Sequence, residues 1–481
     1  MAEFRKILIA NRGEIAIRVM RAANEMGKST VAIFAEEDKL SLHRFKADEA
    51  YKIGEGLGPV ASYLNIKEII SVAKKAEVDA IHPGYGLLSE KPEFAKECSL
   101  AGIKFIGPTA ESMEKLGNKA NARKIAEKAG VPVIPASNIL PDNPEELVKI
   151  AKNIGFPLML KASWGGGGRG MRLINNIEEV EKNILEGKRE AENAFGNSES
   201  FLERYIKNAR HVEVQILGDK GGNIYHLWER DCSIQRRNQK VIERAPAPYL
   251  NDKQRDVVCE MATAICKQVK YECAGTVEFL MDINTNEFFF IEVNPRIQVE
   301  HTITEEITGI DIVRAQIMLS EGSNLNDAIG KRNQSEIVCN GHAIQCRITT
   351  EDPLNNFIPD YGRITAYRGA TGMGIRLDGG TAYSGAIITR FYDSLLEKVT
   401  AWAPTPEDAI SRMDRALREF RIRGVSTNIS FVENLLKHKK FRDNLYTTKF
   451  IDETPELFQF SERQDRATKL LNYIAKTTIE G

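Results

Sequence analysis

The feature that most constrains this chain is a run of glycines between two strand-like segments, KASWGGGGRGM from Lys161 to Met171. FPLMLKAS leads into the run and MRLI leads out of it, and both have the short apolar pattern of β-strands. Gly165, Gly167 and Gly170 fit the spacing G-x-G-x-x-G. A dinucleotide-binding turn must pass from a strand into a helix, however, and the helical pattern IEEVEKNILEGKREAE comes only after the second strand. The run is therefore predicted to form the tip of a β-hairpin.

A glycine-rich hairpin tip can fold over a triphosphate, because backbone N–H groups without neighbouring Cβ atoms approach phosphate oxygens closely. Protein kinases use such a loop. Lys161 ends the leading strand and can reach a phosphate as a point charge. The alternative is a surface hairpin that binds nothing. A Walker A loop is excluded, since G-x-x-x-x-G-K-[ST] does not occur in the sequence.

A second hairpin, TVEFLMDINTNEFFFIEVNPR, carries acidic residues among apolar ones. If Thr285 is the centre of its turn, Glu278 lies opposite Glu292, and like charges in that position destabilise a sheet. A divalent cation that binds both carboxylates, together with the amide oxygen of Asn294 on the same face as Glu292, would offset the repulsion. A shared proton or a shifted register is the alternative. We predict a metal site of Glu278, Glu292 and Asn294.

The first residues of the chain, up to about 115, alternate between two apolar periods. KILIA and STVAIFA are continuous apolar runs, EIAIRVMRAANEMG has helical spacing, and VDAIHPG and IKFIGP follow further helical segments. This alternation predicts a doubly wound parallel sheet. The first turn, ANRGE, has one glycine where a dinucleotide fingerprint needs three, so we interpret this domain as a scaffold rather than a nicotinamide site.

A length of 481 residues favours about three subdomains. Short β-like segments resume after GHAIQCRI and precede the helical pattern PEDAISRMDRALREFRIRG. We therefore predict an α/β protein with a doubly wound N-terminal domain at 1–118, a central domain at 119–330, a C-terminal antiparallel β plus helix domain at 331–448 and a tail at 449–481.

Composition excludes several classes of protein. The 66 basic and 67 acidic side chains give a net charge of -1, which argues against nucleic acid or an anionic membrane as the main partner. No apolar run has the length of a membrane span and the N-terminus lacks a signal-peptide core, so we expect a cytoplasmic protein. The seven cysteines form no CxxC pair, and we expect them to be buried rather than to bind zinc or form disulfides.

A glycine-rich hairpin with a lysine, followed by a Glu…Glu-x-Asn hairpin, resembles the ATP-grasp superfamily. The motifs ILIANRGEIAIR, AIHPGYGLLSE, KASWGGGGRGM, RHVEVQILGD, ERDCSIQRRNQK, FIEVNPRIQVEH, GHAIQCRI and FYDSLLEKV narrow the resemblance to biotin carboxylase over most of the chain. ERAPAPYL and the tail FIDETPELFQFSERQDRATKLLNYI are similar to the pyruvate carboxylase type, in which the tail leads toward a carboxyltransferase domain.

The resemblance implies a central ATP-grasp domain and a half-reaction in which ATP phosphorylates bicarbonate, carboxyphosphate releases CO2, and N1 of biotin is carboxylated. It implies ATP, Mg2+ or Mn2+, and biotin carried on another domain or chain, since no MKM attachment motif occurs. The implied partners are bicarbonate, a biotin carboxyl carrier domain, a carboxyltransferase domain and a second copy in a homodimer or larger homo-oligomer. The alternatives are the carboxylase subunit of another biotin-dependent enzyme, a different ATP-grasp ligase, and a nucleotide-binding module without activity.

The resemblance also implies which residues bind the nucleotide. Lys119, Lys161 and the glycine loop would hold the phosphates, and a second group would surround the adenosine. The loop residues are Gly165, Gly166, Gly167 and Gly168, and the adenosine group is Glu203, Arg204, His211 and Gln235. The remaining residues implied to bind cofactors are Tyr85, Asn238, Glu278, Leu280, Glu292, Gln298 and Val299.

The segment NPRIQVEH supplies the candidate catalytic residues. If it is extended, alternation places Arg296, Gln298 and Glu300 on one face. The resemblance implies that Arg296 offers a planar fork to bicarbonate, that Gln298 donates to it and that Glu300 removes its proton. Lys240 would add positive charge toward the same anion. Arg347 would face the ureido oxygen of biotin, where developing negative charge needs a permanent cation.

Two further points depend on the resemblance. Many members have histidine in QRRHQK where this chain has Asn238, and asparagine can donate a hydrogen bond but cannot carry positive charge. We therefore expect weaker stabilisation of transition-state charge at this position. Arg18, Arg21 and Arg376 lie in segments that members use for dimer contacts, although surface arginines are usually only solvated.

Overall fold

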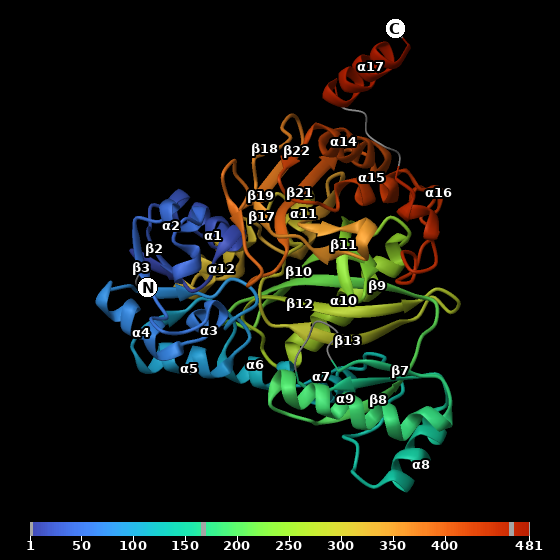
Figure 1. Cartoon of the computed structure of the whole chain (residues 1–481). Helices are drawn as coiled ribbons and strands as arrows, with labels where there is room; N and C mark the ends of the chain where they lie inside the picture. Colours follow the sequence, from blue (N-terminus) through green and yellow to red (C-terminus); the bar gives the residue numbers. More distant parts are fainter. Residues whose placement is uncertain (1–2, 165–169, 461–465, 481) are drawn as a thin grey trace.

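The computed structural model describes residues 3–164, 170–460 and 466–480, and its N-terminal part is a parallel sheet covered on both faces (Figure 1). Ile7 and Ile9 of the first strand pack into one apolar core with helix α1, whereas Leu8 packs into a second core with α4 and α5. The strand order is β3-β2-β1-β4-β5, and all four pairings are parallel. The predicted doubly wound domain is confirmed. Its elements are β1 Lys6–Ile9, α1 Gly13–Glu25, β2 Ser29–Phe34, α2 Leu42–Lys46, β3 Glu49–Lys52, α3 Pro59–Tyr63, α4 Ile66–Lys75, β4 Ala80–His82, α5 Pro92–Leu100, β5 Lys104–Phe105 and α6 Ala110–Gly117.

A small lobe at the bottom of Figure 1 carries the glycine-rich hairpin. Its sheet has the order β7-β6-β8, and the strands on either side of the glycine run pair antiparallel, with Leu158 opposite Ile174. The predicted hairpin is therefore confirmed. Residues 165–168 lie outside the described residues, so their contact with phosphate stays a prediction. The elements of the lobe are α8 Pro144–Ile154, β6 Leu158–Ala162, β7 Arg172–Ile174, α9 Val180–Phe195 and β8 Ser200–Arg204, whereas α7 Lys119–Lys128 precedes the lobe and packs into a different apolar core.

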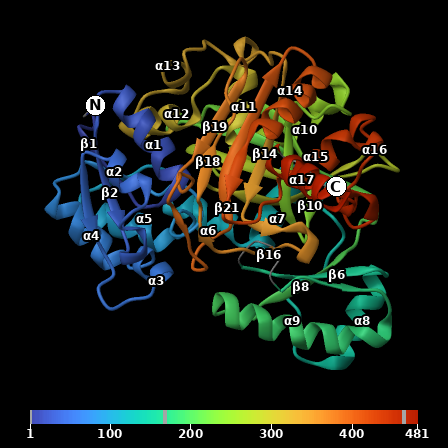
Figure 2. The same cartoon turned by 45° about the horizontal axis from the view of Figure 1, so that its top comes forward.

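An eight-stranded antiparallel sheet forms the centre of the molecule and continues into the C-terminal part (Figure 2). Its order is β13-β12-β9-β10-β11-β14-β21-β19. The sheet crosses the predicted boundary between residues 330 and 331, because β11 pairs with β14 and places Ile242 opposite Cys346. The division of the chain into four segments stays a prediction. The central and C-terminal segments share this one sheet. The strands are β9 Ala209–Gly218, β10 Ile224–Arg236, β11 Gln239–Ala245, β12 Cys273–Asp282, β13 Phe288–Asn294, β14 His342–Thr349, β19 Ile375–Gly379 and β21 Leu395–Ala403.

The helices over this sheet bury its apolar side chains. Val258 and Ala262 of α10 pack on Val212 and Val214 of β9, and Met413 of α14 packs on Val399 of β21. These helices are α10 Asp252–Gln268, α11 His301–Thr308, α12 Ile312–Glu321, α13 Leu325–Ile329, α14 Pro406–Glu419, α15 Ile429–Lys437 and α16 Lys439–Arg442. The short strands are β15 Glu351–Asp352, β16 Ile358–Pro359, β17 Gly362–Arg363, β18 Ala366–Arg368, β20 Ile387–Ile388 and β22 Arg421–Arg423.

One helix is shorter than the sequence pattern predicts. The pattern extends through Gly424, but α14 ends at Glu419 because Phe420 has extended backbone angles and is buried. Arg421–Arg423 instead forms β22, which pairs with β18.

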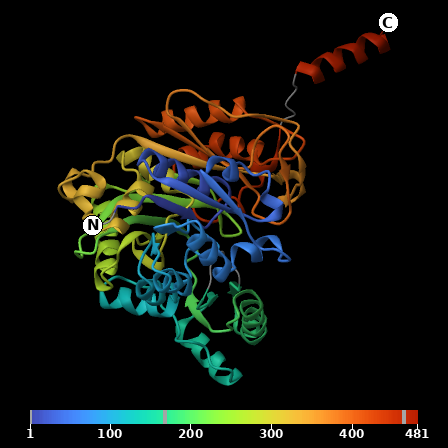
Figure 3. The ribbon, with the colours of Figure 1, turned by 90° about the vertical axis from the view of Figure 1, so that its left-hand side faces the viewer.

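The last helix, α17 Arg466–Glu480, projects away from the body (Figure 3). Leu470, Leu471, Tyr473 and Ile474 on it are exposed. Six of the seven cysteines are buried, as expected, Cys339 is half-buried, and all seven are free thiols. In the described part of the chain, no helix combines the length and apolar character needed to cross a membrane.

A close approach between the N- and C-terminal parts gives a stability prediction. A Cβ on Gly380 would overlap backbone atoms of Gly13 and Glu14, whereas one on Gly117 would meet no atom within 4 Å. We expect Gly380→Ala to lower the free energy of unfolding by about 1–3 kcal/mol, the usual cost of overpacking. Gly117→Ala should be neutral or stabilising, because alanine is the better helix former. Urea unfolding of both variants checks this, and equal stabilities would contradict it.

Candidate active site

A half-buried lysine of the large sheet contacts three carboxylates. The Nζ atom of Lys240, near the start of β11, lies 2.5 Å from Glu213, 2.6 Å from Glu300 and 3.0 Å from Glu278. Glu213 and Glu278 are opposite each other on β9 and β12, and Lys240 is opposite Gln235 on β10. Residues from β9, β11, β12 and the turn before α11 therefore meet at one point.

Cations on both sides stabilise the ionised form of Glu300. Burial opposes its ionisation, but Lys240 and Arg347 outweigh burial and lower the Glu300 pKa below its ordinary value. Arg347 donates to Glu300 over 3.0 Å and to Glu243 over 2.6 Å. Burial opposes the charge of Arg347 as well, but Glu243 and Glu300 raise its pKa. Glu300 is therefore a carboxylate that can accept a proton once one of its cations turns to another anion.

Three of the four predicted catalytic residues, Lys240, Glu300 and Arg347, are thus brought together. Arg296 is directed elsewhere: its Nε atom donates to Glu90 of the N-terminal part, and its Nη2 atom donates to Asn294 over 3.0 Å.

The segment NPRIQVEH is not an extended strand. The placement of Arg296, Gln298 and Glu300 on one face of a strand, which required an extended segment, is therefore corrected. β13 ends at Asn294, and Glu300 is the residue that precedes the first turn of α11. The chain turns because Pro295 cannot donate to a strand ladder. Gln298 still reaches the cluster, since the turn directs its amide nitrogen to Glu278 at 2.8 Å.

Two lysines predicted to bind phosphates are paired with acids in this structure. Lys119 lies 2.8 Å from Glu292, and Lys161 forms a buried ion pair with Glu203. Burial opposes the charge of Lys119, but Glu292 raises its pKa. Each of the two lysines therefore lies against a carboxylate that a phosphate oxygen could replace.

The residues predicted around the adenosine fall into two groups. His211 joins the cluster, because its ring lies 3.0 Å from Glu278 and 2.7 Å from the amide nitrogen of Gln235. Leu280 is directly opposite His211 on β12. Arg204 is exposed and donates to the carbonyl of Ile154 over 3.1 Å, so the structure does not bring it to the cluster.

Three further residues predicted to bind cofactors have contacts or positions of their own. Tyr85 donates to Glu14, and the carbonyl of Val299 accepts from Lys398 over 3.1 Å. Asn238 is exposed in the turn between β10 and β11, where it and Arg237 have φ values of 62° and 50°. Asparagine tolerates this left-handed conformation better than most residues, so Asn238 suits the turn that precedes Lys240.

The predicted metal ligands fit a hard cation in their chemistry. Glu278 is opposite Glu292, as predicted, and a register shift between Glu278 and Phe279 contributes to this pairing. The Asn294 amide nitrogen donates to Glu278 over 2.9 Å, while its oxygen accepts from Arg296. Two carboxylates and an amide are oxygen donors of the type that Mg2+ prefers. A cation between them would require Asn294 to turn its oxygen toward Glu278, and the assignment as metal ligands stays a prediction.

Sequence reasoning missed three fully buried charged residues, Glu213, Arg230 and Glu243. Glu213 and Glu243 balance Lys240 and Arg347, and Arg230 donates to Glu213 over 2.6 Å. The available signal was a charged residue within a central apolar strand, as in RHVEV, since such residues are rarely buried without a partner.

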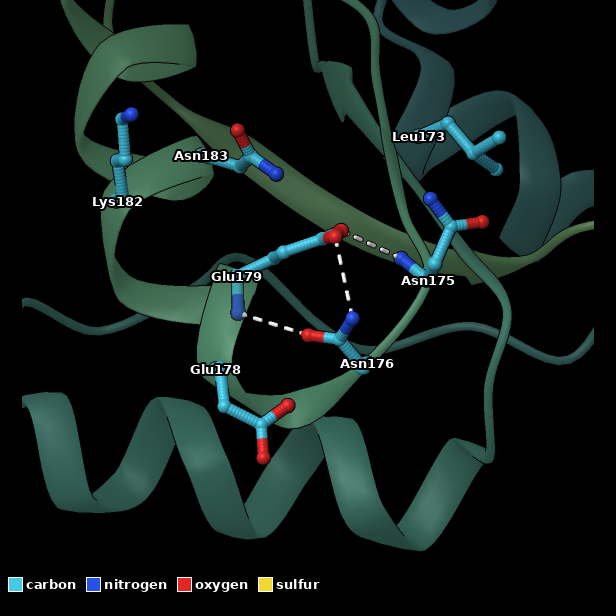
Figure 4. A pocket seen from close by; sticks show the side chains of 7 residues that line it. All are labelled: Leu173, Asn175, Asn176, Glu178, Glu179, Lys182 and Asn183. Carbon is cyan, nitrogen blue, oxygen red and sulfur yellow. Dashed lines mark hydrogen bonds between the residues drawn. The ribbon is translucent and has the colours of Figure 1, made fainter.

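A polar hollow on the small lobe is distinct from this cluster (Figure 4). Its volume is about 650 Å³. Glu179 accepts from the Asn175 backbone at 2.8 Å and the Asn176 side chain at 3.1 Å, while Asn176 caps the turn that begins at Ile177. These contacts satisfy the groups locally, so the hollow is a helix-capping feature.

Sequence profiles of three protein families match successive parts of the chain. They are "Biotin carboxylase, N-terminal domain" at residues 3–113, "Carbamoyl-phosphate synthase L chain, ATP binding domain" at 118–328 and "Biotin carboxylase C-terminal domain" at 345–453.

Whole-chain comparisons agree with these profiles. Pyruvate carboxylase of Bacillus subtilis is 53% identical over 99% of this chain and 41% of its own length. A structure of Rhizobium etli pyruvate carboxylase with the allosteric activator acetyl coenzyme-A is 63% identical, with a TM-score of 0.94 over 98% of this chain and 42% of that one. The biotin carboxylase domain dimer of Hydrogenobacter thermophilus 2-oxoglutarate carboxylase, in complex with MgADP, ADP and bicarbonate, is 45% identical, with a TM-score of 0.92 over 96% of this chain and 100% of that one. The chain thus spans about two fifths of the length of the pyruvate carboxylases it matches.

Proposed function

The chain belongs to the biotin carboxylase family, and from this premise we propose that it catalyses the ATP-dependent carboxylation of biotin by bicarbonate through carboxyphosphate. The observation that carries the proposal is the position of Glu300, which lies 2.6 Å from Lys240 and 3.0 Å from Arg347. A carboxylate held between two cations can take the proton of bicarbonate when the bound anion attracts one of those cations away.

In this proposal, different residues around Glu300 bind bicarbonate and biotin. Lys240 and the Gln298 amide hold bicarbonate beside Glu300, and Arg296 exchanges Glu90 for the bicarbonate oxygens. Arg347 presents a fixed positive charge to the ureido oxygen of biotin, while Tyr85 borders the same space. The biotin arrives on a carrier domain.

Lys119 and Lys161 hold the ATP phosphates with the glycine loop, and Glu278, Glu292 and Asn294 hold Mg2+. The ion supplies charge neutralisation for the phosphates when it is bound. His211 and Gln235, already joined at 2.7 Å, form the wall toward the adenosine.

We also propose that this chain performs the first half-reaction of a pyruvate carboxylase, with a carrier domain and a carboxyltransferase domain as partners. Sequence identities of 53% and 63% to pyruvate carboxylases, against 45% to the 2-oxoglutarate carboxylase domain, favour pyruvate as the final acceptor. The alternative is the carboxylase subunit of another biotin-dependent enzyme. A cytoplasmic location belongs to this proposal, and fractionation of the host cell tests it.

A homodimer is the proposed assembly, and the structure changes which arginines can contribute to it. Arg18 is buried and bonded within the chain to Glu305 at 2.8 Å, and Arg376 binds the same Glu305 at 2.7 Å. Arg21 is exposed and available to a second copy. Sedimentation velocity of the chain tests the dimer.

The proposed function is tested by measuring ADP release with and without bicarbonate and free biotin. A biotin carboxylase releases ADP only with bicarbonate and forms carboxybiotin. A different ATP-grasp ligase would ignore biotin, and a binding module would bind MgATP without cleaving it.

Glu292→Gln tests the metal assignment. A hard cation loses an anionic oxygen, so we expect ATP turnover to fall by about a hundredfold or more and the Mg2+ concentration for half-maximal rate to rise. Glu287→Gln, in the exposed turn of the same hairpin, is the matched control. An unchanged Mg2+ dependence in Glu292→Gln would show that this hairpin does not bind the ion.

A further inference from the structure

Arg230 of β10 is a fully buried cation, with 0% of its surface exposed, and every N–H group of its side chain has a different partner. A guanidinium has five N–H donors. They reach Glu213 at 2.6 Å, Gln215 at 2.8 Å, Thr304 at 3.0 Å, Thr276 at 3.1 Å and Gln298 at 2.7 Å. One side chain thereby connects β9, β12, α11 and the turn that carries Gln298.

The first consequence concerns the orientation of the Gln298 amide. Arginine offers no acceptor, so the atom of Gln298 that faces Arg230 must be the amide oxygen. The amide nitrogen then faces Glu278 at 2.8 Å, and its second N–H has no other acceptor among the described residues. The reverse orientation would place donors against donors and oxygen against carboxylate in a buried site, which is costly. Arg230 therefore determines where Gln298 can donate.

The second consequence concerns Lys240. Arg230 binds Oε1 of Glu213, which leaves Oε2 to bind Lys240 at 2.5 Å. Glu213 is fully buried, and Arg230 and Lys240 are cations that bind its two oxygens. Removing Arg230 would thus weaken the anionic partner that holds Lys240 beside Glu300.

We propose that Arg230 is a positioning residue for the bicarbonate side of the site, acting through the Gln298 amide and through Glu213 on Lys240. It does not touch the substrates. The inference rests on the proposed function, because it assigns bicarbonate to the face formed by Gln298 and Lys240. Lysine cannot replace Arg230, since an ammonium has three donors and no planar fork.

The test compares Arg230→Lys with Arg244→Lys in bicarbonate-dependent ATP cleavage. Arg244 is the matched control, because it is also a buried arginine, 1% exposed. Its partners His342, Asn444 and Tyr446 lie outside the carboxylate cluster. We expect Arg230→Lys to raise the bicarbonate KM by about tenfold or more, as for lost hydrogen bonds to charged groups, and to lower kcat with little change in the MgATP KM. Arg244→Lys should lower the urea midpoint without a selective change in bicarbonate KM.

A milder variant keeps the proposal testable if Arg230→Lys does not fold. Nη2 of Arg230 donates to two acceptors, Thr276 and Gln298. Thr276→Val conserves the shape of the side chain and removes the first of these acceptors. We expect a selective rise in bicarbonate KM of about threefold to tenfold. A double-mutant cycle with Gln298→Met should be non-additive, because Thr276 and Arg230 act on the same amide.

The outcomes separate this inference from the proposed function. If the unmodified chain cleaves ATP only with bicarbonate, but Arg230→Lys changes both KM values equally or matches Arg244→Lys, the function stands and the positioning role is wrong. Additive effects of Thr276→Val and Gln298→Met would also overturn it. If the unmodified chain shows no bicarbonate-dependent cleavage, both ideas fail.

Discussion

Replacing Glu300 with glutamine is expected to reduce bicarbonate-dependent ATP cleavage by about 10² to 10⁴, the usual contribution of a positioned base. Glutamine keeps the shape of the side chain, and its single amide oxygen can still accept from one of the two cations, Lys240 and Arg347, which lie 2.6 and 3.0 Å from the carboxylate. It cannot take a proton from bicarbonate. MgATP and bicarbonate should therefore still bind, and the loss should appear in kcat.

The matched control for this variant is Glu306→Gln on the same helix. Glu306 is a half-buried acid that lies 3.5 Å from Arg376 and outside the Lys240 cluster, so its replacement should leave kcat unchanged. Single-turnover measurements of ADP formation separate chemistry from binding. A Glu300→Gln enzyme with a normal single-turnover rate would show that another group removes the proton.

Arg347→Ala is expected to suppress carboxybiotin formation by about a hundredfold, since one charge-stabilising donor contributes on the order of 3 kcal/mol. ATP cleavage without biotin should be retained, or increased, because Arg347 is one of the cations that lower the Glu300 pKa. Without it that pKa rises toward the working pH, where a base is more effective.

The structure adds a condition to this prediction. Arg347 is also the ion-pair partner of Glu243, which is fully buried at 2.6 Å from it. Truncation therefore leaves a buried carboxylate without its cation, and the urea midpoint should fall. Arg347→Lys, which keeps the charge but loses the fork, should recover stability more than carboxybiotin formation. Equal loss of ATP cleavage and carboxybiotin formation in Arg347→Ala would contradict separate roles for Glu300 and Arg347.

Features that depend on neighbouring residues could be predicted from the sequence. The glycine-rich hairpin could be predicted because it is local in sequence. Its strands, Leu158–Ala162 and Arg172–Ile174, lie on either side of the glycine run and pair with each other. The opposition of Glu278 and Glu292 was predicted from one short turn, because a turn sets the register of its two strands, but it also depends on a register shift between Glu278 and Phe279 that the sequence does not indicate. The parallel N-terminal sheet followed from the alternation of buried runs and amphipathic helices.

Sequence motifs identified the residues of the candidate site, but they did not indicate how these residues are arranged in space. An extended NPRIQVEH was the condition for placing Arg296, Gln298 and Glu300 on one face, and it is not met, because a turn lies between the end of β13 at Asn294 and the start of α11. Arg204, implied for the adenosine group, donates to the carbonyl of Ile154, and its role toward the nucleotide stays a prediction.

Only the tertiary structure determined the charge balance at the centre of the molecule. Lys240, Glu213 and Glu300 are distant in sequence, and their contact depends on the pairing order β12-β9-β10-β11 within one sheet. The same pairing continues from β11 to β14 and places Arg347 beside Glu243 and Glu300. A local pattern indicates which residues face inward, but it does not indicate which inward residues from separate strands meet. That depends on long-range strand pairing, whose free energy is shared over the whole sheet and is not encoded in any one segment.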